Sequence, residues 1–581
     1  MDAGPATLID ILAGDKKYIV PVFQRFYAWN QDNWKALWTD LQLLVHEPDQ
    51  NYDHFIGPMI VNPRAVMHDM TRFFVIDGQQ RLITLSILLC ALRDAAVEHD
   101  FRTFADRVQE MLAFKTTRDQ TVFRMEPRFA DREPFRKVVQ GEIPPRDSEE
   151  SIVQAYHYFK DEIQLDIQLS DGDVFDYLDE VFQSIRKRLK LVSITLEDKD
   201  DPTKIFESMN FKNEKLLNAD LIRNFALMQL PIEKQDEFGN TQWESFEKLF
   251  TDGSSGRPND AELEDFYYRF LIAQVGYFAK GKVYPTFTSF AQERIVGGTI
   301  QEISDSLTGL VTTLKRFARY YRAIVHPENE RDSDLKAAFE KFQLLGVVTA
   351  IPLLMDWYDR YDYDSREDRM NKESFLSMLD ALESFVIRRW IRGERTRGYG
   401  SDFAQAKESD STSDLYRYFH QRGWPSDAEI KDALVDFPLY DKDKKRTRLI
   451  MDQLEISYGH KERVDLRNRD AISIEHILPQ TDRIPDSWKE MLGVNAEEIH
   501  KKYRHTLGNL TLTGYNQELS KKSFDEKKQV YASTAYGSRI ALNEFVLEQD
   551  RWTENKILER TADLSSRLIE IWLAPRRSEA T

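Results

Sequence analysis

The spacing of hydrophobic and polar residues changes along the chain, and each change predicts a different kind of structure. Residues 73–76 and 189–197 are short apolar runs rich in β-branched and aromatic residues, and they predict buried strands. Residues 34–45 and 80–94 repeat apolar residues at helical spacing and predict helices. Because short strands and helices mix over this part of the chain, we expect residues 1–230 to form one α/β domain.

The remaining pattern predicts two further domains. A stretch with Gly, Ser and Pro at 251–262 is typical of a linker or mobile loop. Long amphipathic segments predict a helical middle domain, residues 231–440. Residues 441–581 change again, with a short strand-like run at 471–479 and a closing helix near the end. The sequence therefore predicts a predominantly helical α+β protein of three domains.

Composition narrows the class of protein. A chain of 581 residues is too long for one core, which agrees with several domains. The one cysteine, Cys90, excludes an intramolecular disulfide, and no apolar run reaches the roughly 20 residues of a membrane helix. The N-terminus has neither the basic nor the apolar region of a secretion signal. We therefore expect a cytoplasmic protein with no membrane contact.

The charge pattern limits how the chain binds nucleic acid. A net charge of -18 argues against a protein that coats DNA non-specifically, because such binding depends on neutralising phosphates. Any DNA contact must therefore be local. Basic residues gather at 186–190, at 388–397 and at the pairs 521–522 and 527–528. Each group is either a phosphate contact or a solvated helix face.

A polar sequence, DGQQR, stands where the predicted strand 73–76 meets the predicted helix. Asp77 and Gly78 would form a tight turn, and the helix N-terminus offers unpaired backbone N–H groups to a phosphate. Arg81 could add a two-pronged contact, while Gly78 lets the backbone approach closely. The alternative is structural, with Asp77 capping the helix and pairing with Arg81.

Together with two other blocks, DGQQR resembles the ParB-like domain of GmrSD-type modification-dependent restriction enzymes. The other blocks are PVFQRFYAWN at 21–30 and a segment at 204–225. That family has N-x-R-G where this chain has NFKN at 210–213, although asparagine tolerates a left-handed backbone and lysine keeps the charge. The resemblance implies a domain that binds a nucleoside triphosphate, GTP or another NTP, with hydrolysis left open. The residues it assigns to the nucleotide are Gln24, Arg25, Asp77, Gly78, Gln79, Gln80, Arg81, Asn210, Asp220 and Arg223.

A second group of polar residues lies in the last domain. Glu475 and His476 stand at the end of the strand predicted at 471–479, where a charged pair does not suit a core. A Gly–Asn turn follows about thirty residues later, then Asn516 and a basic segment. Phosphodiester hydrolysis needs a base for water, oxygen ligands for a divalent cation and cations along the cut strand. These residues could fill those roles; taken singly, His476 could be structural and Asn516 a cap.

The order of these residues closely resembles the HNH-type nuclease domain of GmrSD-type enzymes, and more loosely the ββα-metal nucleases. The resemblance implies His476 as general base, Asn509 as the residue that orients His476 or braces its loop, and Glu475 and Asn516 as ligands of Mg²⁺ or Mn²⁺. Adjacent strand residues point to opposite faces, so Glu475 and His476 share one metal site only if the strand bends. DNA contacts are expected from Arg388, Arg389, Arg392, Lys521 and Lys522.

Together the two resemblances imply a prokaryotic anti-phage defence enzyme, a nucleotide-regulated endonuclease that nicks or cleaves modified phage DNA. One HNH site per chain favours a homodimer or two successive nicks. Two alternatives stay open: an abortive-infection nuclease with no modification requirement, and a non-enzymatic binding scaffold with a degenerate HNH domain. Relaxed cleavage of unmodified DNA would favour the first alternative.

Overall fold

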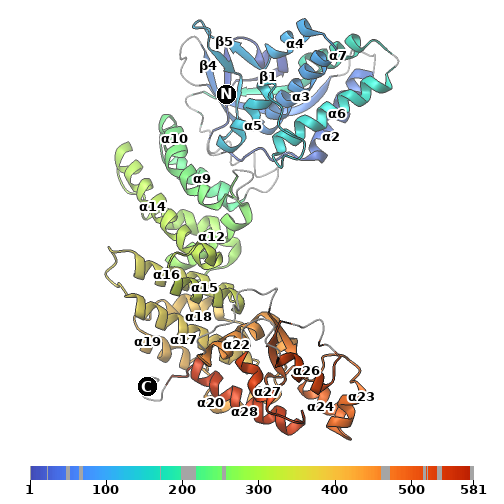
Figure 1. Cartoon of the computed structure of the whole chain (residues 1–581). Helices are drawn as coiled ribbons and strands as arrows, with labels where there is room; N and C mark the ends of the chain where they lie inside the picture. The colour runs from blue at the N-terminus through green and yellow to red at the C-terminus, as the bar shows by residue number, and fades with distance from the viewer. Residues whose placement is uncertain are drawn as a thin grey trace. The chain divides into compact units, whose positions relative to one another are not determined.

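The computed structural model divides the chain into two compact units, which Figure 1 colours by residue number. The first unit comprises Met1–Tyr268 and Lys280–Lys315, and the second comprises Arg269–Ala279 and Arg316–Thr581. No helix in the described part of the chain is long and apolar enough to cross a membrane. The residues that the structure describes are 2–21, 24–46, 53–63, 70–170, 172–197, 200, 217–251, 257–459, 472–514, 519, 521–532 and 540–575.

A six-stranded sheet organises the start of the first unit. The sheet is mixed, because β1–β8 and β3–β4 pair antiparallel whereas β3–β8, β2–β4 and β2–β7 pair parallel. The predicted strands at 73–76 and 189–197 are confirmed as β4 and β8. The strands in spatial order are β1 (Asp2–Thr7), β8 (Leu189–Thr195), β3 (His54–Pro63), β4 (Thr71–Asp77), β2 (Lys16–Ile19) and β7 (Met125–Glu126); a separate hairpin pairs β5 (Ala113–Lys115) with β6 (Thr121–Phe123).

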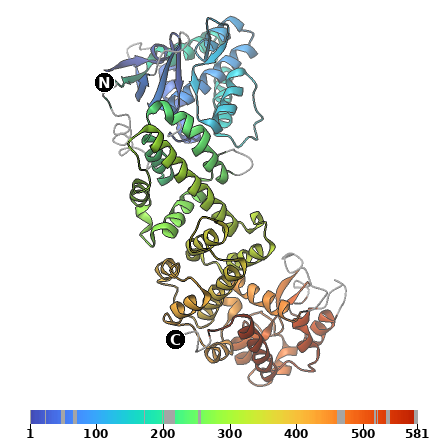
Figure 2. The ribbon, with the colours of Figure 1, turned by 90° about the vertical axis from the view of Figure 1, so that its left-hand side faces the viewer.

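Helix α3 (Gln79–Glu98) follows β4 after one residue and forms the centre of this unit's core. It is buried along most of its length because other helices pack around it, and Figure 2 shows the helices to one side of the strands. This confirms the helix predicted at 80–94 and fixes DGQQR between a buried strand and a buried helix. The helices that pack against α3 are α4 (Arg102–Gln109), α5 (Phe129–Gln140), α6 (Ser151–Leu169) and α7 (Val174–Gln183), while α1 (Leu8–Leu12) and α2 (Gln31–His46) complete this part of the unit.

Helices make up the rest of the first unit and the beginning of the second. Helices α12 (Asp260–Val275) and α14 (Ile300–Val325) each have residues in both units, and α12 begins inside the linker predicted at 251–262. The chain is therefore the predominantly helical α+β protein that the sequence predicts, while the three-domain division stays a prediction. The other helices are α9 (Asn218–Met228), α10 (Ile232–Phe238), α11 (Glu244–Glu247), α13 (Val283–Gln292), α15 (Ser333–Leu345), α16 (Ile351–Asp362), α17 (Lys372–Ile391), α18 (Tyr399–Ala406), α19 (Thr412–His420), α20 (Asp427–Leu434), α21 (Leu439–Lys442) and α22 (Lys444–Ser457).

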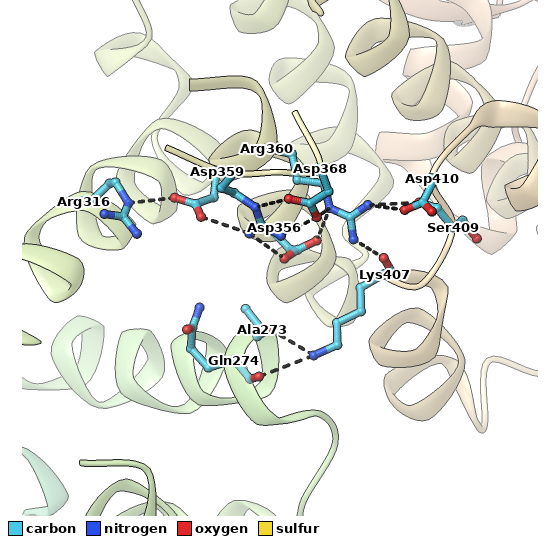
Figure 3. A network of polar contacts seen from close by, with 11 residues as sticks. Ala273, Gln274, Arg316, Asp356, Asp359, Arg360, Asp368, Lys407, Ser409 and Asp410 are labelled. Carbon is cyan, nitrogen blue, oxygen red and sulfur yellow. Dashed lines mark hydrogen bonds and ion pairs between the residues drawn. The ribbon is translucent and has the colours of Figure 1, made fainter. Parts of the chain in front are cut away.

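A network of charged side chains holds several helices of the second unit together (Figure 3). Arg360 on α16 donates to Asp356 at 2.9 Å and to the carbonyl of Ser409 at 3.2 Å, and Arg316 on α14 donates to Asp359 at 2.7 Å. Because these groups are mostly buried, each charge needs the partner that it has here. The network ties α14 and α16 to the segment that follows α18.

The end of the second unit builds a small two-stranded sheet surrounded by helices. Strands β9 (Ser473–His476) and β10 (Leu510–Thr513) pair antiparallel, which confirms a strand inside 471–479. The predicted closing helix is confirmed as α28 (Glu554–Ile571). A hydrophobic cluster that includes Ile477, Leu478 and Trp552 packs directly after β9 and fixes the loop there. The remaining helices are α23 (Asp486–Leu492), α24 (Ala496–Tyr503), α26 (Phe524–Tyr531) and α27 (Glu544–Leu547).

Candidate nucleotide pocket and nuclease site

Two glycines bring strand β3 close to the start of α3. Gly57 and Gly78 have left-handed backbones, with φ of +107° and +91°. A side-chain carbon at Gly57 would lie 1.9 Å from Nη1 of Arg81, and one at Gly78 would lie 3.2 Å from the carbonyl oxygen of Pro58. Glycine therefore suits both positions on conformational and steric grounds. The close approach lets Arg81 Nη1 donate to the carbonyl of Ile56 at 2.8 Å.

A cavity of about 460 Å³ opens beside Asp77 and Arg81. Asp77 Oδ2 lies 3.6 Å from Arg81 Nη2 and is buried without a hydrogen-bond partner among the residues that the structure describes. Burial lowers the pKa of Arg81, and the neighbouring carboxylate of Asp77 opposes that shift. The charge of Arg81 is therefore the partner of this buried oxygen. The remaining lining residues are Trp29, Asn33, Ala36, Leu37, Asp40, His54, Phe55, Ile56, Pro58 and Leu85.

The structural alternative for DGQQR, in which Asp77 caps the helix and pairs with Arg81, is confirmed only for the pairing. Asp77 and Arg81 form the predicted pair, as an ion pair four residues apart. No side chain caps α3, however, because the residue before the helix is Gly78 and its backbone is left-handed. The N-terminal N–H groups of α3 therefore have no side-chain cap from that position.

The glutamines of the motif face away from the cavity and hold the segment 25–28 against α3. Gln80 accepts a hydrogen bond from the backbone N–H of Ala28 at 2.8 Å and donates to the carbonyl of Phe26 at 3.0 Å. Gln79 donates to the carbonyl of Arg25 at 3.3 Å, and Gln24 donates to that of Ile76 at 2.8 Å. The side chains of Gln24, Gln79 and Gln80 therefore position the segment that leads to Trp29, a residue of the cavity wall.

Asp220 and Arg223 lie in a buried ionic network around Glu247. Arg223 Nη1 lies 2.6 Å and Arg128 Nη2 3.0 Å from the two oxygens of Glu247, and Arg223 also pairs with Asp220. Burial alone would raise the pKa of Glu247, but Arg223 and Arg128 hold it below its ordinary value. Arg223 further donates to the carbonyl of Gln24 at 3.2 Å. The network thus holds the backbone at Gln24 in place. Asn210 lies outside the described residues.

In the second unit, Asn509 braces the loop that follows β9. Its Oδ1 accepts from the N–H of Leu478 at 2.7 Å, and its Nδ2 donates to the carbonyls of Leu478 and Arg504 at 3.0 and 2.9 Å. His500 contacts the carbonyl of Pro479 at 2.7 Å. Of the two roles expected for Asn509, its hydrogen bonds match the bracing of the loop, since no contact of its side chain with His476 is found among the described residues.

His476, the predicted base, lies at the end of β9 and is 4% exposed. Its Nε2 lies 3.1 Å from Nδ1 of His505, and the ring of Tyr440 packs edge-on at 4.6 Å between centroids. Burial, helped by neighbouring positive groups, lowers the pKa of His476 to about 3. The imidazole is therefore neutral at physiological pH, and the same burial makes it a weaker base than an exposed histidine.

Glu475, the neighbour of His476 on β9, forms a buried ion pair with Lys527, whereas His476 contacts His505. Lys527 on α26 lies 2.6 Å from Glu475 Oε1 and donates to the carbonyl of His476 at 2.6 Å. Burial raises the pKa of Glu475 and lowers that of Lys527. A metal ion at this carboxylate would have to displace the lysine, and the described residues hold no group of three or more His, Cys, Asp or Glu side chains suited to a metal. The other expected ligand, Asn516, lies outside them.

The Gly–Asn turn before β10 packs directly against α28. A side-chain carbon at Gly508 would lie 2.3 Å from the carbonyl oxygen of Ile557 and 2.3 Å from the hydroxyl of Thr561. Arg560 on the same helix donates to the carbonyls of Gly508 and Leu510 at 2.8 and 2.7 Å. Helix α28 therefore fixes the strand that pairs with His476.

Gly508→Ala is expected to destabilise this region by about 3 kcal/mol, the upper end for overpacking, because a backbone carbonyl cannot move aside as a side chain does. Thermal unfolding of the purified variant checks this. Gly309→Ala in α14 is the matched control, because open space surrounds that glycine. Equal loss of stability in both variants would contradict the steric argument.

The basic residues expected to contact DNA lie in different environments. Arg388 is 0% exposed and binds the carbonyls of Trp572 and Pro425 and the carboxylate of Asp427. Arg389 binds the carbonyls of Arg422, Gly423 and Arg395. Both guanidinium groups therefore brace the fold. Arg392 and Lys521 are exposed and Lys522 is half-buried, so these three side chains are the ones open to a phosphate.

Sequence reasoning missed several residues that these two sites contain. Asn33 and Asp40 are seven residues apart on α2, a spacing that places both on one helix face, and helical periodicity could have indicated them. His505 lies in the segment that carries the nuclease resemblance. Lys527 belongs to the basic pair 527–528, but it is buried beside Glu475 and is neither a phosphate contact nor part of a solvated helix face. No local pattern relates them to His476 and Glu475, which are 29 and 52 residues away in sequence.

Comparison with protein families gives two matches. Residues 8–227 match the model of the GmrSD restriction endonuclease N-terminal domain. Residues 424–567 match the model of the GmrSD restriction endonuclease C-terminal domain. No curated protein matches the chain. The first match contains the cavity beside Asp77, and the second contains His476 together with Tyr440, His505 and Lys527, which contact it.

Proposed function

Because the chain belongs to the GmrSD restriction endonuclease family, we propose that it is an anti-phage restriction enzyme whose HNH-type domain cleaves modified DNA under the control of a nucleotide. The family makes DNA cleavage in restriction the expected activity. The observation that carries the proposal is the position of His476, at a braced strand end and beside His505, inside the matched C-terminal domain. In this role His476 accepts the proton of the water that attacks the phosphorus atom.

The ParB-like first domain, residues 1–230, is proposed to bind the nucleotide in the cavity of about 460 Å³. A volume of this size suits a small ligand. Arg81 offers a cation to the phosphates, Trp29 an aromatic surface to the base, and the partly exposed carboxylate of Asp77 an acceptor for a donor on the ligand or for a metal-bound water. The motif glutamines act indirectly, by holding the wall of the cavity.

DNA and a divalent cation complete the proposal. Arg392, Lys521 and Lys522 are the side chains proposed to contact phosphates of the DNA. Mg²⁺ or Mn²⁺ is proposed as the cation, and it would supply positive charge to the leaving oxygen. Asn516 is one proposed ligand, and Glu475 can be the second only if its carboxylate leaves Lys527.

The test is cleavage of plasmid DNA by the full chain with Mg²⁺ or Mn²⁺. Glucosylated, methylated, phosphorothioate and unmodified DNA are each incubated with and without each nucleoside triphosphate. Cleavage of one modified DNA only, changed by one nucleotide, is the expected result. Cleavage of all DNA would favour the abortive-infection nuclease, and no cleavage of any DNA, with the cation present, would favour a scaffold without enzyme activity.

Arg81→Ala is expected to weaken triphosphate binding by about 10–100-fold, because one charge-assisted contact contributes about 1.5–3 kcal/mol. Titration of the full chain with each labelled triphosphate measures the loss. Arg118→Ala, which removes the same charge from an exposed position in the same unit, is the control. If the wild type and Arg81→Ala bind the triphosphates with equal affinity, DGQQR has a purely structural role.

A further inference from the structure

His505 contacts Nε2 of His476, the proposed base. Its Nδ1 lies 3.1 Å from Nε2 of His476, and the two rings are nearly perpendicular at 84°. A hydrogen bond between two neutral imidazoles needs one N–H donor and one lone pair. Only one of the two possible arrangements leaves His476 with a free lone pair, which is the arrangement in which His476 Nε2 carries the hydrogen.

We propose that His505 is a positioning residue of the nuclease, which accepts the hydrogen bond from His476 Nε2 and so leaves His476 Nδ1 as the nitrogen that takes the proton from water. This inference rests on the proposed function, in which His476 is the base. His505 exchanges no proton with the substrate; it selects the tautomer and the ring orientation of His476. The tautomer is inferred from the chemistry, because the positions of nitrogen atoms fix no hydrogen.

The surroundings hold both rings in this arrangement. The ring of Tyr440 stacks on His505 with an interplanar angle of 11° and meets His476 edge-on at 86°. The backbone N–H of Tyr440 donates to the carbonyl of His505 at 3.4 Å. His476 is almost wholly buried, whereas His505 is half-buried. The ring of His476 is thus confined between fixed groups, and a change at His505 alters its hydrogen bonding directly.

The test compares three substitutions in the full chain. His505→Leu removes the acceptor, and His505→Asn places an amide oxygen near the position of Nδ1. His420→Leu, at an exposed position on α19, is the matched control. Nitrogen-15 NMR of labelled histidines distinguishes an Nε2–H from an Nδ1–H tautomer. The chain has 11 histidines, and His476→Gln identifies the signal of His476 by its loss.

The expected result is an Nε2–H tautomer of His476 in the wild type and in His505→Asn, and a shifted tautomer in His505→Leu. The kcat for DNA cleavage should fall about 10–100-fold in His505→Leu with KM unchanged, and recover to within a few-fold in His505→Asn. A purely structural role would not be rescued in this way. An Nδ1–H tautomer in the wild type, or an unchanged kcat in His505→Leu, overturns the proposal.

The two measurements also separate this inference from the proposed function. If the wild type cleaves no DNA but His476 shows the Nε2–H tautomer that His505→Leu changes, the positioning contact is supported and the nuclease function fails. If the wild type cleaves DNA but neither the tautomer nor kcat responds to His505, the nuclease function stands and the positioning role is overturned.

Discussion

His476→Ala is expected to reduce the rate of DNA cleavage by about 10²–10⁴-fold, the range for loss of a general base. The neutral imidazole at the end of β9 is the group that accepts the proton in the proposed mechanism, and alanine has no atom that can replace it. Single-turnover cleavage of the DNA identified as substrate measures the rate directly. Because the first unit is not changed, triphosphate affinity should equal that of the wild type.

Two controls keep this result specific. His420→Ala removes an exposed histidine of the same unit and should leave the cleavage rate unchanged. The unfolding temperature of His476→Ala shows whether lost packing against Tyr440 and His505 explains the loss. A folded His476→Ala variant that cleaves DNA at the wild-type rate would remove His476 from the mechanism.

The sequence predicts those parts of the sites that depend on neighbours along the chain. The strand, turn and helix around DGQQR follow from local patterns, and β4, Gly78 and α3 match them. The left-handed backbone of Gly78 agrees with a tight turn at that point. The pairing of Asp77 with Arg81 is also local, because Asp77 ends β4 and Arg81 lies in the first turn of α3, with only Gly78 between the two elements.

The other site residues depend on contacts between segments that are distant in sequence. The type of a residue does not show which distant segment it contacts. Arg388 belongs to an arginine-rich segment, yet its partner at Trp572 is 184 residues away and takes it into the interior. Arg223 likewise follows a motif that suggests phosphate binding, but Glu247 and the carbonyl of Gln24 occupy its donors. An arginine that binds phosphate and one that binds a buried carboxylate have the same local sequence signal.

The alternation of side chains along a strand limits the metal-ligand role that the family resemblance implies for Glu475. Alternation along a strand predicts opposite directions for Glu475 and His476. In the structure Glu475 pairs with Lys527 and His476 faces His505, so the two side chains have partners on different elements. Whether the carboxylate exchanges Lys527 for a metal ion is a matter of competition between two cations, and the cation dependence of cleavage measures it.

Glu247→Leu is expected to destabilise the first unit by about 3–5 kcal/mol, the range for breaking a buried ion pair from one side. Glu247 is 1% exposed and neutralises both Arg128 and Arg223, which are themselves buried. Leucine would leave two buried guanidinium groups with less compensation, and Trp243 Nε1 would lose its acceptor at 3.1 Å. Denaturant unfolding of the full chain, followed by a probe in the first unit, measures the change.

The matched control is Glu237→Leu, which breaks an exposed ion pair with Lys234 at 3.0 Å in the same unit and should change stability by less than about 1 kcal/mol. Glu247→Gln keeps the shape and the hydrogen-bond acceptor but removes the charge, so its loss of stability should lie between the two. If Glu247→Leu is as stable as the wild type, Arg128 and Arg223 have found other partners for their charges. Arg223 is then again a candidate for contacting the nucleotide. A large loss instead assigns Arg223 to the support of the backbone at Gln24, because the same guanidinium cannot neutralise Glu247 and bind a phosphate with the same donors.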